Sequence, residues 1–170
     1  MTAGYAPALW ANLFLAGGTA AATLCGLIFV AVSVNLGRIL EFDAAASTRH
    51  LSGRALDAIV GLLLALTVCL LGLVPQPLAA LGGELAAAAL AAAAVPVRVL
   101  LHRGTRTVPH RRAQLVRLGL GLTAALCLLA AGCTTAARAG GGLYWAVPGI
   151  LLAIAGATTN AWILLIEIHR

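Results

Sequence analysis

The sequence contains no lysine, and charged residues of any kind make up only 9% of its 170 positions. Aromatic residues are also few, at 5%, whereas hydrophobic residues make up 62% and the mean hydropathy is +1.02. Soluble domains are roughly half apolar and about a quarter charged. A chain with so little polar surface cannot face water on all sides. The composition therefore excludes an ordinary soluble domain and indicates one integral membrane domain.

The sequence also lacks the motifs of soluble catalysis. It has no phosphate-binding loop followed by lysine, no HExxH and no GxSxG, and the spacing of its four histidines matches no metal motif. We therefore expect no enzyme activity, no cofactor and no metal site. The cysteines show no CxxC spacing, so we expect unpaired, buried thiols that pack as small hydrophobic side chains. They are Cys25, Cys69, Cys127 and Cys133.

Five hydrophobic segments are long enough to cross a bilayer. The hydrocarbon core is roughly 30 Å thick and needs about 20 helical residues. No basic region precedes the first segment, so a cleaved signal peptide is not expected. The sequence predicts an all-α bundle of five transmembrane helices in a single domain over residues 1–170. The spans are expected at about residues 9–36, 55–74, 79–101, 115–133 and 143–167.

The third span is the least certain, because only 13 residues separate Glu84 from Arg98. It can cross if it begins near Leu78 and keeps Glu84 inside the membrane. It can also cross if it continues to Leu101 while Arg98 reaches back to the interface. An intramembrane Glu84 needs a partner, and Arg138 is the cation available at that end. We predict a Glu84–Arg138 pair, with an ordinary interfacial glutamate as the alternative.

Arginine is distributed unequally between the two ends of the spans. Ten of the eleven arginines fall in the first-to-second connection, the third-to-fourth connection and the C-terminal tail, whereas Arg138 stands alone at the other end. The positive-inside rule then predicts an external N-terminus and a cytoplasmic C-terminus, in a bacterial inner membrane. The most basic connection, Arg98 to Arg117, would attract anionic lipid headgroups, although topology alone explains it. Membrane topology also explains the basic charge without nucleic acid.

Small and hydroxylated residues recur at steps of three and four along the first and last spans. Such stripes let helix backbones approach closely, and their hydroxyls and amides can bond across the contact. Helix packing is the simpler interpretation, and a water-lined path or subunit seam is the alternative. The stripe residues are Thr19, Thr23, Gly26 and Ser33 in the first span, and Gly149 and Gly156 in the last.

Polar residues from three spans fall near the level expected to be the inner leaflet. Charges near hydrocarbon are costly unless they are paired or hydrated. We therefore predict an ion pair that joins Arg38 or Arg54 to Glu167 or Asp57. The cluster is interpreted as a clasp that fixes helix register, with a gate, an ion site or a docking site as alternatives. Its members are Asn35, Arg38, Arg54, Asp57, Asn160 and Glu167.

Three stretches resemble a group of small multi-pass membrane proteins from high-GC bacteria. The stretches are GLIFVAVSVNLGRIL from Gly26, LVPQPLAALGGEL from Leu73, and GGLYWAVPGILLAIAGATTNAWILLIEIHR from Gly141. Some members of this group are named as modulators of a membrane-bound ATP-dependent protease. The resemblance implies a membrane bundle and carries over no catalytic residue.

Two function classes remain open at this point. The first is a non-enzymatic accessory or regulatory protein that binds another membrane protein through its small-residue faces. The second is a small oligomeric channel or transporter with a path lined by threonine and serine. A lipid-binding role centred on the arginine-rich connection is a third option. An exposed stripe around a symmetry axis favours the channel, and a stripe buried within one protomer favours the accessory role.

Overall fold

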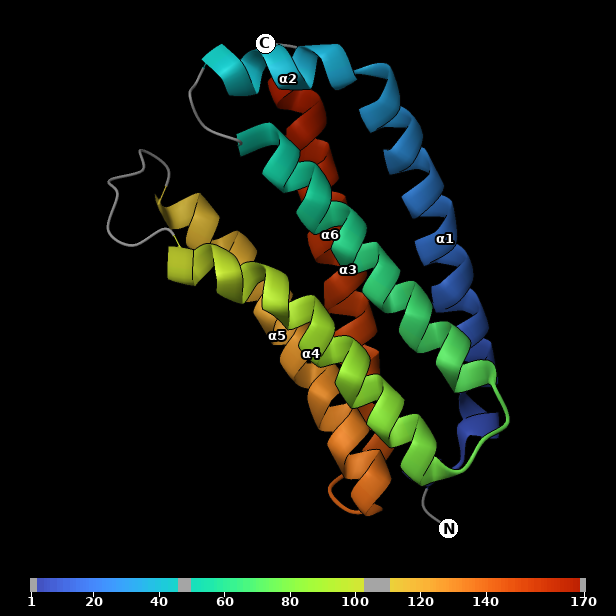
Figure 1. Ribbon diagram of the computed structural model, residues 1–170. Coiled ribbons are helices and arrows are strands. Elements are labelled where there is room, and N and C mark those ends of the chain that lie inside the picture. Colours follow the sequence, from blue (N-terminus) through green and yellow to red (C-terminus); the bar gives the residue numbers. More distant parts are fainter. Residues whose placement is uncertain (1–2, 46–49, 103–110, 169–170) are drawn as a thin grey trace.

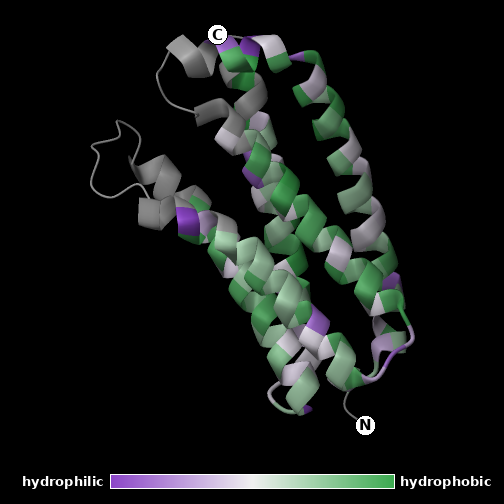
Figure 2. Ribbon diagram, viewed as in Figure 1, coloured by the Kyte–Doolittle hydropathy of each residue, from purple (hydrophilic) through white to green (hydrophobic). Residues whose placement is uncertain are grey.

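Long helices dominate the structure. The computed structural model describes the backbone of residues 3–45, 50–102 and 111–168, which contains no strand. Five of its helices are long and apolar enough to cross a membrane, which confirms the prediction of an all-α protein with five spans. Figure 2 shows hydrophobic residues along most of their length. These spans are Pro7–Val34, Ala55–Leu73, Leu78–Arg98, Leu118–Ala137 and Gly142–Ile163.

The elements follow one another with short connections. Two 3₁₀ turns, η1 (Ala3–Tyr5) and η2 (Pro7–Trp10), lead into the first long helix, and a third, η3 (Gly142–Trp145), leads into the last. Proline cannot continue a helical hydrogen-bond ladder, and Pro75 and Pro77 separate the second long helix from the third. The α-helices are α1 (Ala11–Val34), α2 (Leu36–Ala45), α3 (His50–Leu73), α4 (Leu78–His102), α5 (Arg111–Ala137) and α6 (Ala146–Ile168).

Helix α3 is the central element of the bundle. It packs against α1, α4 and α6, while α5 packs against α4 and α6 (Figure 1). The core between them is built from fully buried leucine and other apolar side chains, among them Leu62, Leu81 and Leu128. Helix α1 contacts chiefly α3. It therefore lies at the edge of the bundle with one face uncovered.

Helix α2 is an element that the sequence analysis missed. The first span was expected to end in a charged connection, but the chain turns at Asn35 and continues as a helix. Figure 1 shows α2 lying across the end of the bundle. Ile39 is only 1% exposed and packs with Ala55 and Val32, whereas Arg38 and Leu40 are exposed. A short helix with one buried apolar residue among exposed neighbours is typical of a membrane interface.

The cysteines follow the sequence prediction only in part. All four thiols are free, as expected. Cys69 is buried in the core, and Cys25 and Cys127 are partly buried. The expectation of burial is wrong for Cys133, which is exposed. Cys133 lies on an outward face of α5, where a lipid-facing thiol is as acceptable as any small apolar group.

Candidate functional site

The stripe of small residues on α6 is covered inside the protomer. A Cβ on Gly149 would lie 2.6 Å from the Leu128 side chain, and one on Gly156 would lie 3.0 Å from Leu120. Between them, Ala153 is buried. Glycine at these positions lets α5 and α6 approach closely. This half of the predicted pattern therefore serves packing within one protomer.

The stripe on α1 lies in the opposite environment. Thr19, Thr23 and Ser33 are exposed, and a Cβ on Gly26 would meet no atom within 4 Å. The Thr19 hydroxyl donates to the Leu15 carbonyl at 2.8 Å, and the Thr23 hydroxyl donates to the Thr19 carbonyl at 2.9 Å. These intrahelical bonds satisfy the hydroxyl protons, so the face can contact lipid or another helix without an unpaired donor.

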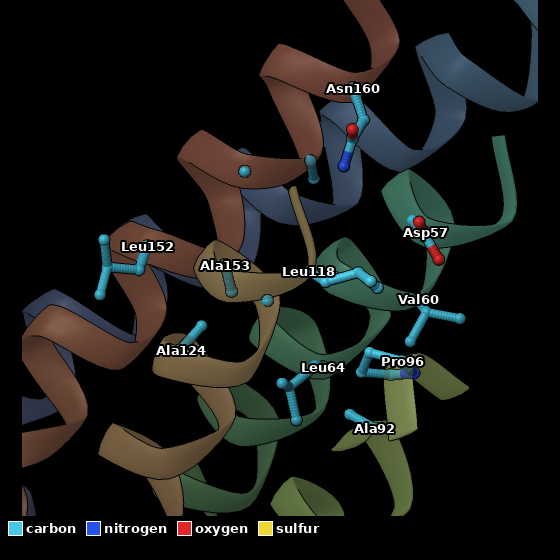
Figure 3. A pocket seen from close by; sticks show the side chains of 14 residues that line it. Asp57, Val60, Leu64, Ala92, Pro96, Leu118, Ala124, Leu152, Ala153 and Asn160 are labelled. Atoms are coloured by element: carbon cyan, nitrogen blue, oxygen red, sulfur yellow. The ribbon is translucent and has the colours of Figure 1, made fainter. Parts of the chain in front are cut away.

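A cavity of about 60 Å³ lies between the other four long helices. Its walls are mostly apolar, and they include Leu64 of α3, Ala92 of α4, Ala124 of α5 and Ala153 of α6. Figure 3 shows these side chains around the hollow. This is the feature with the clearest capacity to bind something inside a single protomer.

Two polar side chains reach this cavity, Asp57 from α3 and Asn160 from α6. Both lie within candidate membrane spans. Asp57 lies near the start of α3 and Asn160 near the end of α6. Figure 3 shows both side chains on the same side of the cavity, away from Leu64 and Ala124. Asn160 is 9% exposed. The Oδ2 atom of Asp57 is buried and accepts no hydrogen bond in the described chain, although the residue takes part in another polar interaction.

Of the six polar residues predicted to meet, the structure thus brings two to one cavity. Asn35 is at the turn between α1 and α2, where its side-chain amide donates to the Ala31 carbonyl at 2.8 Å. Arg38 is exposed on α2. The side chains of Arg54 and Glu167 lie outside the described part of the chain, so the ion-paired clasp stays a prediction. The same holds for most of the basic connection between α4 and α5.

Glu84 lies in the second turn of α4, inside the span that begins at Leu78. Its carboxylate accepts a hydrogen bond from the Gln76 side chain at 2.8 Å. The same Gln76 nitrogen donates to the Leu71 carbonyl at 3.3 Å, at the end of α3. The predicted partner, Arg138, is exposed at a positive φ of 53°, and the described residues show no ion pair between it and Glu84. Gln76 is the partner that sequence reasoning missed.

At the end of the bundle opposite α2, aromatic side chains join the N-terminal turns to the segment before α6. The Gly141 backbone N–H donates to the Tyr5 hydroxyl at 3.1 Å, which joins the N-terminal turn to the connection between α5 and α6. Trp10 and Tyr144 form an edge-to-face pair with ring centroids 4.9 Å apart. Gly141 has a φ of 106°, a conformation that favours glycine. Tyrosine and tryptophan in such a position suit a membrane–water interface.

Comparisons of the chain with known protein families, with curated proteins and with solved structures find no match. The α1 face and the cavity are the structural features that bear on the function of this protein.

Proposed function

We propose that this protein is a non-enzymatic membrane protein that binds a second membrane protein against the outward face of α1. The observation that carries the proposal is the open space at Gly26, where a Cβ would meet nothing within 4 Å. Exposed hydroxyl residues, Thr19, Thr23 and Ser33, accompany it along the helix. We call these four residues the α1 stripe.

The physical chemistry of helix association in a bilayer explains why small and hydroxylated residues on α1 indicate a binding face. Lipid tails are as apolar as leucine, so burying apolar surface does not drive helices together there. Helices associate there through close backbone contact and through hydrogen bonds across the contact, and both need small or hydroxylated residues. The similar stripe on α6 is already covered by Leu120 and Leu128 within the protomer. The α1 stripe is the one that a partner can use.

The rest of α1 supports the same reading. Its opposite face carries Phe14, Ala21 and Ile28, which are buried in the bundle core. Helix α1 is therefore held on one side by its own protein and offers the other side. A helix with one packed face and one small-residue face is suited to connect two bundles.

In the proposed orientation the N-terminus is external and the C-terminus is in the cytoplasm of a bacterium. The basis is the arginine distribution, with ten of eleven in the connections and tail assigned to the cytoplasm. The membrane is the inner membrane, and α2 lies on its cytoplasmic surface. The resemblance to a group that includes named modulators of a membrane-bound protease is consistent with an accessory role.

A small oligomeric channel or transporter is the second candidate. The exposed hydroxyls of Thr19 and Thr23 favour it, since a ring of copies with α1 inward would place them along a central path. Coverage of Gly149 and Gly156 within the protomer weakens it, because the α6 stripe then lines no path. The accessory role therefore has the better support.

Site-specific photocrosslinking in native membranes tests the proposal. A benzophenone amino acid is placed at position 26 and, as the matched control, at Ala20, which is also exposed on α1 but about 120° away around the helix. We expect position 26 to give a discrete adduct whose added mass is that of another membrane protein, and position 20 to give little of it. An adduct of two or more copies of this chain would favour the channel. Equal or absent adducts at both positions would contradict a docking face.

A further inference from the structure

The cavity between α3, α4, α5 and α6 is open on the side of α5. Gly121 lines the cavity and is exposed, and a Cβ on it would meet no atom within 4 Å. The residue lies inside the candidate membrane span Leu118–Ala137. Figure 1 also shows the His102 end of α4 set apart from the start of α3. The cavity is therefore reached from outside the bundle, at a depth where lipid surrounds the protein.

The size and the walls of the cavity restrict what can fill it. Its volume is about 60 Å³, whereas sites that enclose organic ligands are typically about 300–1,000 Å³. Only a thin part of a larger molecule fits. An empty void loses dispersion contacts, and ordered water needs about two to four polar partners, which walls such as Leu64 and Ala124 do not provide. A segment of a lipid acyl chain meets all these conditions.

The cavity also has the polarity of an amphiphile. Figure 3 shows Asp57 and Asn160 on one side of it, away from Leu64 and Ala124. Asp57 lies near the start of α3 and Asn160 near the end of α6. A lipid with its polar part towards these ends of the helices would place its chain against the apolar walls.

The charge of α4 and α5 near the cavity selects the headgroup. Arg98 is exposed on α4, two residues after Pro96, which lines the cavity. Arg117 directly precedes Leu118, which lines it from α5. From residue 98 to residue 117 the sequence has six arginines and no acidic residue. Basic segments at the ends of membrane helices attract anionic headgroups.

We propose that this cavity holds a segment of one acyl chain of an anionic phospholipid, whose headgroup lies at the basic ends of α4 and α5. The lipid is then an ordered component of the protein, because part of it replaces side-chain packing between four helices. The site requires no charge from Asp57, which keeps its other polar interaction. It is also independent of the docking role of α1, since no residue of the α1 stripe lines the cavity.

Photocrosslinking from the lipid tests the proposal. The full-length protein is reconstituted in phosphatidylcholine vesicles that contain phosphatidylglycerol with a diazirine in one acyl chain, and adducts are mapped by mass spectrometry. We expect adducts at Leu64 and Ala124, which are 7% and 1% exposed. Leu63 and Leu126 are 46% and 63% exposed and should react less. Unlabelled phosphatidylglycerol should compete for the adducts in the cavity.

Two glycines of α5 provide a matched pair of variants. Gly121→Leu puts a side chain into the cavity without a clash, and Gly119→Leu puts one on α5 outside it, since a Cβ on either would meet no atom within 4 Å. The two positions are about 200° apart around the helix. Adducts in the cavity should fall about tenfold in Gly121→Leu, the scale for filling a void of this size. They should be unchanged in Gly119→Leu.

The headgroup is tested with a phosphatidylcholine probe that carries the same diazirine chain. It should give about fivefold fewer cavity adducts at low salt, the scale of one arginine near a membrane surface. The difference should shrink at high salt, because ions screen exposed charges.

Several outcomes would overturn the proposal. Adducts at Leu63 and Leu126 as frequent as those at Leu64 and Ala124 would mean ordinary surrounding lipid, and no adduct in the cavity would mean that water fills it. Equal adducts in wild type and Gly121→Leu would place the chain elsewhere. Equal adducts from both headgroups would refute the anionic lipid. If Gly121→Leu does not fold, Ala92→Leu fills the cavity from α4 and decides the matter.

Discussion

Gly82 and Gly132 lie against each other where α4 packs along α5. A Cβ on either glycine would lie 2.6 Å from the backbone carbonyl oxygen of the other. The backbones of the two helices are therefore in direct contact at this point. Contacts of this kind depend on small residues, because any side chain would hold the helices apart.

This contact leads to the first prediction. Gly82→Ala should destabilise the protein by about 1–3 kcal/mol, because its Cβ would also meet the Ala136 backbone nitrogen at 2.6 Å. The neighbouring Gly83→Ala is the matched control, since a Cβ there meets nothing within 4 Å. It should be neutral or stabilising by up to about 1 kcal/mol. Thermal unfolding in detergent measures both, and equal effects would contradict the direct backbone contact.

The packing of α1 on α3 gives the second prediction. Phe14 is fully buried, and its ring lies 2.6 Å from where a Cβ on Gly72 would stand. Phe14→Ala should lower the free energy of unfolding by about 3 kcal/mol, because it leaves a cavity that the helices cannot close. Leu15→Ala, at a residue that is 61% exposed, should cost less than about 0.5 kcal/mol. A comparable loss in both variants would mean that α1 is not held by this ring.

The third prediction concerns the link between the N-terminal turn and the connection before α6. Tyr5→Phe removes the oxygen that accepts the Gly141 N–H and should cost about 0.5–1.5 kcal/mol. Hydrogen exchange should become faster at residues 3–10 and at the amide of Gly141. Tyr144→Phe is the control, because Tyr144 contributes its ring to Trp10. Unchanged exchange in Tyr5→Phe would show that the link does not hold the segment.

The fourth prediction separates two possible partners of Glu84. A double-mutant cycle with Gln76→Ala and Glu84→Ala should give a coupling energy of about 1 kcal/mol, because the two side chains share a hydrogen bond. A cycle with Arg138→Ala and Glu84→Ala should give a coupling close to zero. A coupling with Arg138 larger than that with Gln76 would restore the ion pair that the sequence predicts.

The membrane spans could be predicted from the sequence because their signal is local. About 20 consecutive apolar residues are needed to cross a bilayer, and proline, glycine or charge separates such runs here. Helix α4 runs from Leu78 to His102, so it has both the early start and the late end that were considered for the third span, and Glu84 lies within the helix. The amphipathic helix α2 could not be recognised, because ten residues with one buried isoleucine resemble a polar connection.

The sequence could not predict which of the two stripes is covered within the protomer and which is exposed. Gly26 and Gly149 belong to the same kind of pattern, yet the first faces open space and the second faces Leu128. In a soluble protein, polarity distinguishes the inside from the outside of a helix. In a membrane bundle both surroundings are apolar, so periodicity does not tell them apart. The cavity could not be predicted in detail either, because Asp57 and Asn160 line one space only once α3, α4, α5 and α6 are packed together.

The segments before and after α1 are both anchored to the rest of the bundle. At one end the Tyr5 hydroxyl is bonded to Gly141, and at the other Ile39 is inserted beside Ala55. Rotation of α1 about its own axis would require one of these two contacts to break. The orientation of the α1 face that carries Gly26 is thus set in the protein before a partner binds. A partner helix therefore binds a preorganised surface, and α1 loses little rotational freedom when the two helices associate.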